Sequence, residues 1–328
     1  ALNIKELAQK AGVSVATVSY VLNGKNKVSV ATREKILALI ESEGYEFNSA
    51  ARDLKKQSNK IIAICLDSLH GYFFNELING IEQAAIKLGY NFIVATSFGN
   101  DKSSAYKILS ERRADGAIIL APILESEFLL ATAAKNTPLV LLDRELAHPN
   151  IRNILLDNVS GINQAIDELV TKKITKIGYI SGIKSHFDAQ QRLDAYYSSM
   201  AKHQLTVNEP WIFAGEFDQR SGEHVALNLL SSNQSNWPEA IVCANDEMAI
   251  GLEQTLLAHQ IKIPEQISII GFDDIVISRY VTPSLSTISH SKQELGRLAV
   301  DSLIKLIQKR EVTNLKINTS FIKRNSSR

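Results

Sequence analysis

The sequence is poor in the features that build disulfides, metal sites and membrane spans. Cys65 and Cys243 are its two cysteines among 328 residues, and each lies inside an apolar run, so the sequence offers no CxxC pair and no disulfide framework. We therefore expect a reducing compartment, the cytoplasm, and no metal or cofactor. No apolar run approaches the ~20 residues that cross a bilayer. The opening segment ALNIKELAQK is polar from its third residue, so we expect neither membrane insertion nor secretion.

The remaining composition is typical of a globular protein of about two domains. Hydrophobic residues make up 45% and charged residues 22% of the sequence, which argues against disorder. The net charge of +1 is unevenly distributed: residues 1–60 hold ten lysines and arginines against six acidic residues, whereas the remainder holds 26 against 29. A basic first segment ahead of a mildly acidic body indicates that the two parts face different partners, the first of them a polyanion.

Three short amphipathic helices are predicted in the first 45 residues. Asn3 can cap the first helix and Gly12 ends it. Ser14 can cap a second helix at residues 15–22, and a third begins near Ser29. Two helices joined by a glycine-containing turn are typical of a helix-turn-helix, whose second helix enters the major groove of DNA. A generic three-helix bundle would give the same spacing.

From residue 61 onward, short apolar runs alternate with amphipathic stretches. We predict strands at residues 61–66, 91–96, 117–121, 139–142, 176–181, 240–244 and 268–272. The predicted helices are residues 73–88, 103–112, 161–171, 189–203, 221–230, 247–258 and 293–309. Strand–helix alternation with fully apolar strands predicts parallel sheets covered on both faces. This many elements fit two doubly wound lobes better than one very wide sheet.

The residues that directly follow the predicted strands are the candidate ligand contacts, because ligands of doubly wound folds bind at the carboxyl ends of the strands. These segments are residues 68–74, 143–144, 182–192, 245–246 and 273–274. From the residues alone, Asp246 is interpreted as the cap of the helix that follows it. Asp274 is interpreted as solvated or as part of a structural ion pair.

A series of motifs runs through the whole chain in a fixed order. The head contains IKELAQKAGVSVATVSYVLNG followed by AARDLKKQ, and the body contains PLVLLDRE, ILLDNVSG, AIVCANDEMAIG, ISIIGFDD and PSLSTI. In these motifs the chain resembles the LacI/GalR family of bacterial transcription regulators. The resemblance implies a small all-α helix-turn-helix headpiece with a hinge helix. It further implies an α/β doubly wound, two-lobed body similar to periplasmic binding proteins.

The resemblance also implies domain boundaries and partners. It places the headpiece at residues 1–47, the hinge helix and linker at 48–60, the first lobe of the body at 61–157 and 291–318, and the second lobe at 158–290 and 319–328. The implied partners are double-stranded operator DNA and a small-molecule effector. A homodimer is expected, because tetrameric relatives add a C-terminal heptad helix that this sequence does not show. Whether a protein corepressor exists stays open.

The second headpiece helix matches the family's recognition helix, in which apolar Val15 and Ala16 would suit thymine methyls or the five-position of cytosine. Residues 49–56 match the hinge helix, in which Leu54 would insert as a wedge into the minor groove. The DNA-binding residues that the resemblance implies are Ser14, Val15, Ala16, Thr17, Ser19, Tyr20, Asn23, Asn48, Ala51, Leu54 and Lys55.

The body positions that match the family's effector site suit a small polyol. The planar fork of Arg192 can hold two hydroxyls or a carboxylate, and aromatic residues can stack on a sugar ring or a base. Asp157 is a further candidate wall residue. The effector-binding residues that the resemblance implies are Phe73, Phe74, Asp143, His186, Asp188, Arg192, Phe217, Asn245, Asp273 and His290.

Together these features favour a sequence-specific DNA-binding regulator, a repressor of a carbohydrate-utilisation operon controlled by a sugar or sugar phosphate bound between two lobes. A purine-type corepressor fits the same polar and aromatic set and is the alternative. No GxSxG, GxxxxGK[ST], GxGxxG or HExxH motif is present, so we expect no enzyme. A plain solute-binding protein would have no use for residues 1–60.

Overall fold

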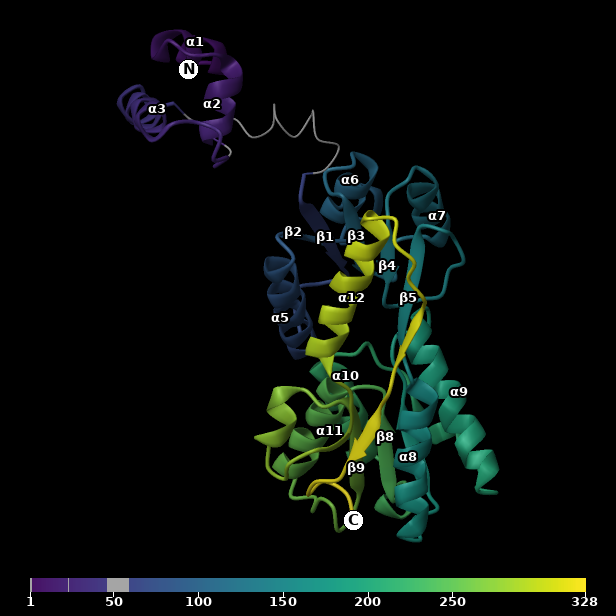
Figure 1. The fold of residues 1–328 in the computed structure, drawn as a ribbon. Helices are drawn as coiled ribbons and strands as arrows, with labels where there is room; N and C mark the ends of the chain where they lie inside the picture. Colours follow the sequence, from purple (N-terminus) through teal and green to yellow (C-terminus); the bar gives the residue numbers. More distant parts are fainter. Residues whose placement is uncertain (1, 23, 46–58) are drawn as a thin grey trace. The chain divides into compact units, whose positions relative to one another are not determined.

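The computed structural model describes residues 2–22, 24–45 and 59–328. The chain divides into two compact units, Ala1–Asn59 and Lys60–Arg328, which are coloured purple and blue through yellow in Figure 1. The implied hinge helix at residues 49–56 lies outside the described residues. The same holds for the predicted DNA contacts Asn23, Asn48, Ala51, Leu54 and Lys55.

The first unit is built from three helices, which are α1 (Ile4–Ala11), α2 (Val15–Leu22) and α3 (Val30–Ser42). Asn3 caps α1 as predicted, in a capping box with Glu6: the backbone N–H of Glu6 donates to Asn3 Oδ1 at 3.0 Å, and that of Asn3 donates to Glu6 Oε2 at 2.9 Å. Leu7, Val18 and Ile36, one from each helix, are fully buried against one another. The three predicted helices are therefore confirmed.

The second unit contains two six-stranded sheets, one in each lobe. The sheet of the first lobe has the order β11-β5-β4-β3-β1-β2 and is parallel throughout. Its strands are β1 (Ile61–Leu66), β2 (Asn91–Thr96), β3 (Gly116–Leu120), β4 (Leu139–Leu141), β5 (Ile151–Leu156) and β11 (Leu315–Ile317).

The sheet of the second lobe has the order β12-β10-β9-β8-β6-β7 and is parallel except where β12 pairs antiparallel with β10. Its strands are β6 (Ile177–Ile180), β7 (Ile212–Phe213), β8 (Ala240–Cys243), β9 (Ser268–Asp273), β10 (Ser286–Ser289) and β12 (Ser320–Ile322). The chain passes between the lobes after β5, between β10 and the helix that follows it, and between β11 and β12 (Figure 1).

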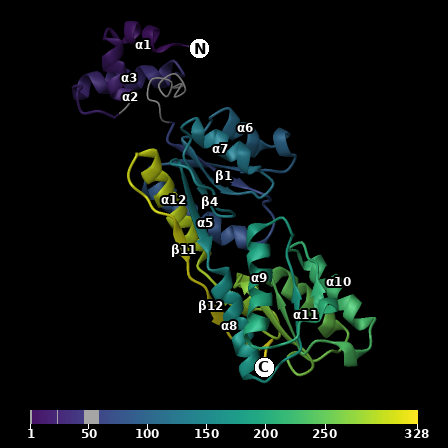
Figure 2. The same cartoon turned by 90° about the vertical axis from the view of Figure 1, so that its right-hand side faces the viewer.

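Helices cover both faces of each sheet, as predicted (Figure 2). Those of the first lobe are α5 (Tyr72–Lys87), α6 (Ser104–Ser110), α7 (Ser126–Ala134) and α12 (Lys292–Ile307). Those of the second lobe are α8 (Asn158–Thr171), α9 (Phe187–Lys202), α10 (Gln219–Leu230) and α11 (Asp246–Ala258). None of the helices in the described ranges combines the length and the apolar character that crossing a bilayer requires.

Side chains of successive residues in β1 face opposite layers. Ile62 and Ile64 pack in the cluster that contains Leu77 of α5, whereas Ala63 and Cys65 pack in the cluster that contains α6 and α7. This alternation is the two-residue period of a strand buried on both faces. It explains why the strand consists of a continuous apolar run.

The contact between α5 and α12 is unusually close. A Cβ atom on Gly80 would lie 2.0 Å from the backbone oxygen of Gln293, and one on Gly296 would lie 2.4 Å from that of Leu77. Two glycines therefore let the helix backbones touch. This packing holds the start of α12, which follows directly from the second lobe, against the middle of α5 (Figure 1).

The sequence-based prediction misses several short elements. β5, β7 and β10 and helix α7 were not predicted, because polar residues such as Arg152 and Asn153 interrupt their apolar pattern or because they span very few residues. The C-terminal segment KINTSFIKR contains residues of both β11 and β12, which belong to different sheets. The two-lobed, doubly wound architecture itself is confirmed.

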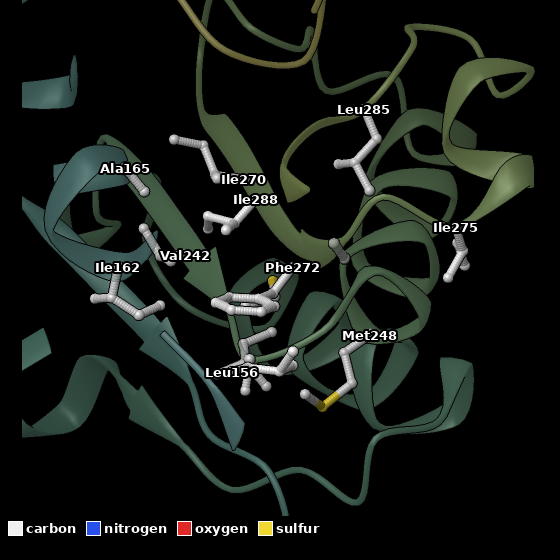
Figure 3. Close-up of a cluster of buried hydrophobic side chains, with 14 of the residues drawn as sticks. Leu156, Ile162, Ala165, Val242, Met248, Ile270, Phe272, Ile275, Leu285 and Ile288 are labelled. Carbon is white, nitrogen blue, oxygen red and sulfur yellow. The ribbon is translucent and has the colours of Figure 1, made fainter. Parts of the chain in front are cut away.

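Apolar side chains from the sheet, α8 and α11 form the core of the second lobe (Figure 3). Phe272 of β9 lies at its centre, surrounded in the figure by Leu156, Val242, Met248 and Ile288, and has no exposed surface. Its ring also supports a polar side chain, because the guanidinium carbon of Arg192 lies 3.6 Å from the ring centroid. The core thus reaches to the cleft between the lobes.

Glu253 is an acidic side chain inside this lobe. The residue is completely buried, its Oε1 accepts a hydrogen bond from Gln254 Nε2 at 3.1 Å, and its Oε2 has no hydrogen-bond partner within the described part of the chain. Burial raises the pKa of Glu253 to about 8, from an ordinary value of 4.5. The side chain is therefore protonated in the folded protein at neutral pH.

We expect Glu253→Gln to flatten the pH dependence of stability. Because the folded pKa is raised, the contribution of the neutral side chain is fully present below pH 4.5 and is lost as the pH rises to about 8. The variant has no such titration. Urea unfolding should show it gaining about 3–4 kcal/mol over the wild type between pH 5 and pH 8. Identical pH profiles would contradict this; Glu223→Gln on the exposed face of α10 is the matched control.

Candidate ligand-binding cleft and nucleic-acid interface

The start of α2 exposes the residues that the sequence predicted to face DNA. Ser14, Val15 and Ala16 are exposed, and 41% of Val15 is accessible although it is apolar. Thr17, Ser19 and Tyr20 are half-buried. Val18 and Val21 point into the headpiece core instead, so helix periodicity separates the core face from the face that is available to a partner. Val15 therefore leaves apolar surface at the helix start that is available to a partner.

Positive charge gathers beside this helix. The ammonium groups of Lys25 and Lys27 lie 5.7 Å and 5.9 Å from the centroid of the Tyr20 ring. Arg33 Nη2 donates to the backbone oxygen of Lys25 at 2.8 Å, which fixes this loop against α3. The headpiece therefore presents a short apolar and hydroxyl-bearing helix start flanked by cations.

A cavity of about 380 Å³ lies between the two lobes of the body, within the range of small-molecule sites. It is bordered by the carboxyl ends of β1, β3, β8 and β9 and by the first turns of α5, α9 and α11. Nine of the ten residues predicted to bind an effector line it, namely Phe73, Phe74, Asp143, His186, Asp188, Arg192, Phe217, Asn245 and Asp273.

Arg192 is the buried cation of the cavity. It is 4% exposed, its Nε donates to Asn158 Oδ1 at 2.8 Å, and its Nη1 donates to the backbone oxygen of Ala244 at 2.6 Å. Nη2 lies 3.7 Å from Asp273 Oδ1. The ring of Phe272 lies against the guanidinium group, and Nε and Nη1 are engaged by Asn158 and Ala244. Nη2 is therefore the nitrogen that lies beside Asp273, a residue of the cavity wall.

Asp273 and Asp274 end β9 in an unusual backbone conformation. Their φ angles are +109° and +50°, a region that side chains with a Cβ rarely adopt. Asp273 lines the cavity, whereas Asp274 pairs with Arg324 and with Arg279. Although burial opposes it, these hydrogen bonds lower the pKa of Asp274. The interpretation of Asp274 as part of a structural ion pair is thus confirmed.

Aromatic rings form the apolar part of the wall. Phe73 and Phe74 meet edge to face with ring centroids 5.7 Å apart. The ring of Phe217 stacks on His186 at 5.8 Å and occupies the space of a missing side chain, because a Cβ on Gly182 would lie 2.0 Å from it. Burial lowers the pKa of His186, although carboxylates including Asp67 oppose this.

The cavity is acidic. Among the described residues that line it, a single arginine faces seven carboxylates, which are Asp67, Asp143, Asp188, Glu216, Asp218, Glu247 and Asp273. Asp143 is 4% exposed, and burial raises its pKa although its hydrogen bonds with Arg144 oppose this. The lining thus offers many hydrogen-bond acceptors and little uncompensated positive charge.

Glu247 joins the two lobes across the cavity. It lies in the first turn of α11, and its Oε1 accepts the backbone N–H of Tyr72 at the start of α5 at 3.1 Å. Gly71, the cap residue of α5, supplies no side chain and has φ +106°; a Cβ there would lie 2.9 Å from Glu247 Oε1. The carboxylate thus caps a helix of the opposite lobe.

Three sequence interpretations are wrong in detail. Asn245, not Asp246, caps α11, because its Oδ1 accepts the N–H of Met248 at 3.0 Å. Asp246 points into the core.

Asp157 caps α8 and pairs with Lys316 instead of lining the cavity. His290 is buried behind the wall, where its Nε2 donates to Asp273 Oδ1 at 3.2 Å; burial lowers its pKa and so favours the neutral ring.

Sequence reasoning also missed part of the lining. Glu216 and Asp218 follow β7, a strand of two residues that was not predicted. Asp67 directly follows β1 and precedes the segment that was singled out. Within the described ranges, no cluster of three or more histidine, cysteine or acidic side chains could hold a metal ion.

Comparison with known proteins shows which families and relatives the chain is similar to. Residues 3–48 match the model for "Bacterial regulatory proteins, lacI family", and residues 166–327 match "Periplasmic binding protein-like domain". The chain is 33% identical over its full length to a "Probable HTH-type transcriptional repressor ExuR" of Bacillus subtilis, of which it covers 98%. It is 34% identical to the "Ribose operon repressor" of Haemophilus influenzae, with 93% of this chain and 92% of the relative covered.

A solved structure with the same architecture is the lac repressor dimer bound to operator and the anti-inducer ONPF. It has a TM-score of 0.86 and 27% sequence identity to this chain. The match covers 99% of this chain and 98% of the other. The likeness therefore extends over both the headpiece and the two-lobed body.

Proposed function

Because this chain belongs to the LacI family of bacterial regulatory proteins, we propose that it is a repressor of carbohydrate-utilisation genes whose operator affinity is controlled by a neutral sugar bound between its lobes. It is an effector-controlled DNA-binding regulator and not an enzyme. The proposal includes a cytoplasmic location and the domain boundaries at residues 47, 60, 157, 290 and 318 that the sequence implies.

The balance of charge in the cavity carries the choice of ligand class. Seven carboxylates face one arginine, whose own nearest counter-charge is Asp273. A phosphate or carboxylate on the ligand would add negative charge to this site, where the described lining residues offer no second arginine or lysine to neutralise it; this is costly in a partly buried environment. The hydroxyl groups of a neutral sugar donate to carboxylates, and aromatic rings cover its apolar face. We therefore favour a neutral monosaccharide over a sugar phosphate.

A thermal-shift screen tests the ligand class. A ligand that binds the native state raises the melting temperature, and the rise grows with the logarithm of the ligand concentration once that concentration exceeds Kd. We expect a rise with at least one neutral sugar among D-ribose, D-glucose and D-galactose. We expect none with glucose 6-phosphate or D-galacturonate. A rise with these anions alone would overturn the neutral-sugar assignment, and a rise with hypoxanthine or guanine alone would favour the purine alternative.

The exposed start of α2 supports a direct reading of base edges. Val15 and Ala16 would contact thymine methyl groups in the major groove, while Ser14, Thr17 and Ser19 reach the phosphates. Tyr20, Lys25 and Lys27 would follow the DNA backbone, to which cations contribute affinity that falls with salt. Leu54 in the hinge segment would open the central base step.

We expect Val15→Ala to weaken operator binding about five- to tenfold and to leave binding to unrelated DNA unchanged. The reason is that Val15 is exposed, so in this proposal the substitution removes a base contact and leaves the headpiece core in place. Lys25→Ala is the matched control: it should weaken both complexes and reduce the salt dependence by about one unit of slope. Titrations by fluorescence anisotropy at several salt concentrations measure both. An equal loss on both DNAs in Val15→Ala would contradict base reading.

A homodimer would present two headpieces to two half-sites of a near-palindromic operator. Large apolar side chains are exposed along α5 and beyond the edge strand β2, among them Ile86 at 67% and Phe98 at 88%. Exposed apolar surface of this kind is typical of association faces. We propose that the body associates through this edge of the first lobe.

The link between Glu247 and Tyr72 supports a mechanism for control. A sugar that contacts both walls favours the arrangement in which this interlobe hydrogen bond is made. The effector then shifts the population of lobe arrangements by no more than its difference in affinity for them. In this proposal the shift changes how the two first lobes of the dimer present their headpieces to the operator.

A further inference from the structure

Lys292 is a buried lysine directly behind the cavity. It is the first residue of α12, where the chain passes from β10 in the second lobe to α12 in the first. Its side chain is 2% exposed, and its ammonium donates to the backbone oxygens of Asp273 and Asp274. A buried ammonium is stable only where oxygen atoms surround it. Lys292 itself does not line the cavity.

The two carbonyl groups that Lys292 binds belong to the strained turn at the end of β9. Asp273 and Asp274 both have positive φ angles, at a cost of about 1–3 kcal/mol for each residue. Such a conformation persists only where its surroundings hold it. The ammonium of Lys292 lies at the point where it can do so, because it draws both carbonyl oxygens to one position.

This turn decides where the two adjacent carboxylates point. The Asp273 carboxylate lies at the cavity beside Arg192. The Asp274 carboxylate is held away from the cavity lining by ion pairs with Arg324 and Arg279. Adjacent side chains of a regular strand also point to opposite faces. Here the positive φ angles of the turn additionally set the place of the Asp273 carboxylate at the cavity. Releasing the turn would therefore move the Asp273 carboxylate relative to Arg192.

The third oxygen near Lys292 belongs to the other lobe. Glu76 Oε1 lies 3.6 Å from the ammonium nitrogen and has no hydrogen-bond partner in the described portion of the chain. Glu76 lies on α5, one turn after Phe73, and Phe73 also contacts His290 at a centroid distance of 5.9 Å. The ammonium thus connects the Asp273 turn in one lobe with the helix that carries the aromatic wall in the other.

We propose that Lys292 is a positioning residue of the effector site, one that fixes Asp273 in the second lobe relative to the aromatic pair at the start of α5 in the first. The proposal rests on the proposed function in one respect, that the cavity binds the effector. It predicts that Lys292 affects sugar affinity through the position of Asp273. It also predicts that Lys292 affects the distance between the lobes through its ion pair with Glu76. A lysine that merely stabilises the fold would do neither selectively.

The first test is a double-mutant cycle on sugar affinity. Lys292→Met keeps the length of the side chain and removes the ammonium. With D-ribose, D-glucose and D-galactose as probes in calorimetry, we expect it to weaken the sugar that binds the wild type by at least tenfold. In an Asp273→Ala background the same substitution should change affinity by less than about twofold, because the group it positions is gone. An equal loss in both backgrounds would overturn the proposal.

The second test needs no ligand. Spin labels on Glu127→Cys in α7 and Asn228→Cys in α10, both exposed, report the distance between the lobes. The native thiols would not react, because burial raises the pKa of Cys65 to about 12 and that of Cys243 well above its ordinary value. We expect a broader or shifted distance distribution in Lys292→Met than in the wild type.

Glu76→Gln serves as the milder second variant if Lys292→Met does not fold. It leaves the ammonium and its two carbonyl contacts in place and removes the charge on α5, so it should change the interlobe distance. Arg297→Met on the exposed face of α12 is the matched control and should change nothing. If no sugar binds the wild type, the proposed ligand class fails while the spin-label distances still decide the role of Lys292. Unchanged distances in both variants would overturn that role.

Discussion

Replacing Arg192 with alanine should abolish the effector response of operator binding and leave operator binding itself intact. The guanidinium is the single arginine among the described residues that line the cavity. It is held rigid by Asn158, the backbone of Ala244 and the ring of Phe272. A rigid charged donor contributes strongly to a hydrogen bond with a ligand. We expect sugar affinity to fall at least 100-fold, or about 3 kcal/mol.

Two measurements separate this effect from a general loss of structure. Calorimetry with the sugar that stabilises the wild type gives the affinity, and anisotropy with operator DNA gives repressor function with and without the sugar. Arg192→Lys is the control. It keeps the charge but cannot reproduce the fork that reaches Asn158 and Ala244 together, so its sugar affinity should lie between those of the wild type and Arg192→Ala. A normal sugar response in Arg192→Ala would remove the cavity as the effector site.

The second large effect is expected on stability, at Asp246. This carboxylate is completely buried and accepts hydrogen bonds from the backbone N–H of Ile275 at 2.9 Å and from Ser278 Oγ at 2.7 Å. Thr287 Oγ1 is a third donor, to its other oxygen. Asp246→Ala would leave three buried donors without a partner. We expect the free energy of unfolding to fall by about 3–5 kcal/mol.

Urea unfolding at pH 6 measures this loss. Burial, reinforced by the charge of Asp273, raises the pKa of Asp246 to about 7, so its three donors stabilise a carboxyl group that titrates near neutrality. Ser278→Ala is the matched control, since it removes one donor and leaves the carboxylate two; it should cost about 1 kcal/mol. A loss in Asp246→Ala no larger than that of Ser278→Ala would show that the three contacts do not act as a unit.

Local sequence patterns predicted the headpiece well because its determinants are local. The capping box of Asn3, the end of α1 at Gly12 and the start of α2 after Ser14 are all interactions within a few residues. The buried positions Val18 and Val21 follow from helix periodicity alone. The exposed remainder of α2 was therefore available as a candidate interface before any tertiary contact was known.

The cavity was partly predictable because its walls are carboxyl ends of parallel strands. Asp143, Asn245 and Asp273 follow directly from this rule. Arg192 lies at the end of a segment that the rule selects, and the family resemblance singled it out and added Phe217. Glu247 was missed, although it lies beside Asn245, because nothing local shows that it caps a helix in the other lobe. Contacts between residues far apart in the sequence are absent from local patterns.

The sequence by itself determined the kinds of element, their order and the segments that carry the ligand-facing groups, since these depend on periodicity, caps and strand ends. Only the tertiary structure decided which member of an adjacent pair faces the cavity: Asn245 caps a helix at its rim while Asp246 enters the core, and Asp273 lines it while Asp274 pairs with Arg324. The physical reason is that side-chain direction is set by backbone angles and by distant partners. Here a buried lysine, a turn with positive φ and arginines from other segments fix that direction.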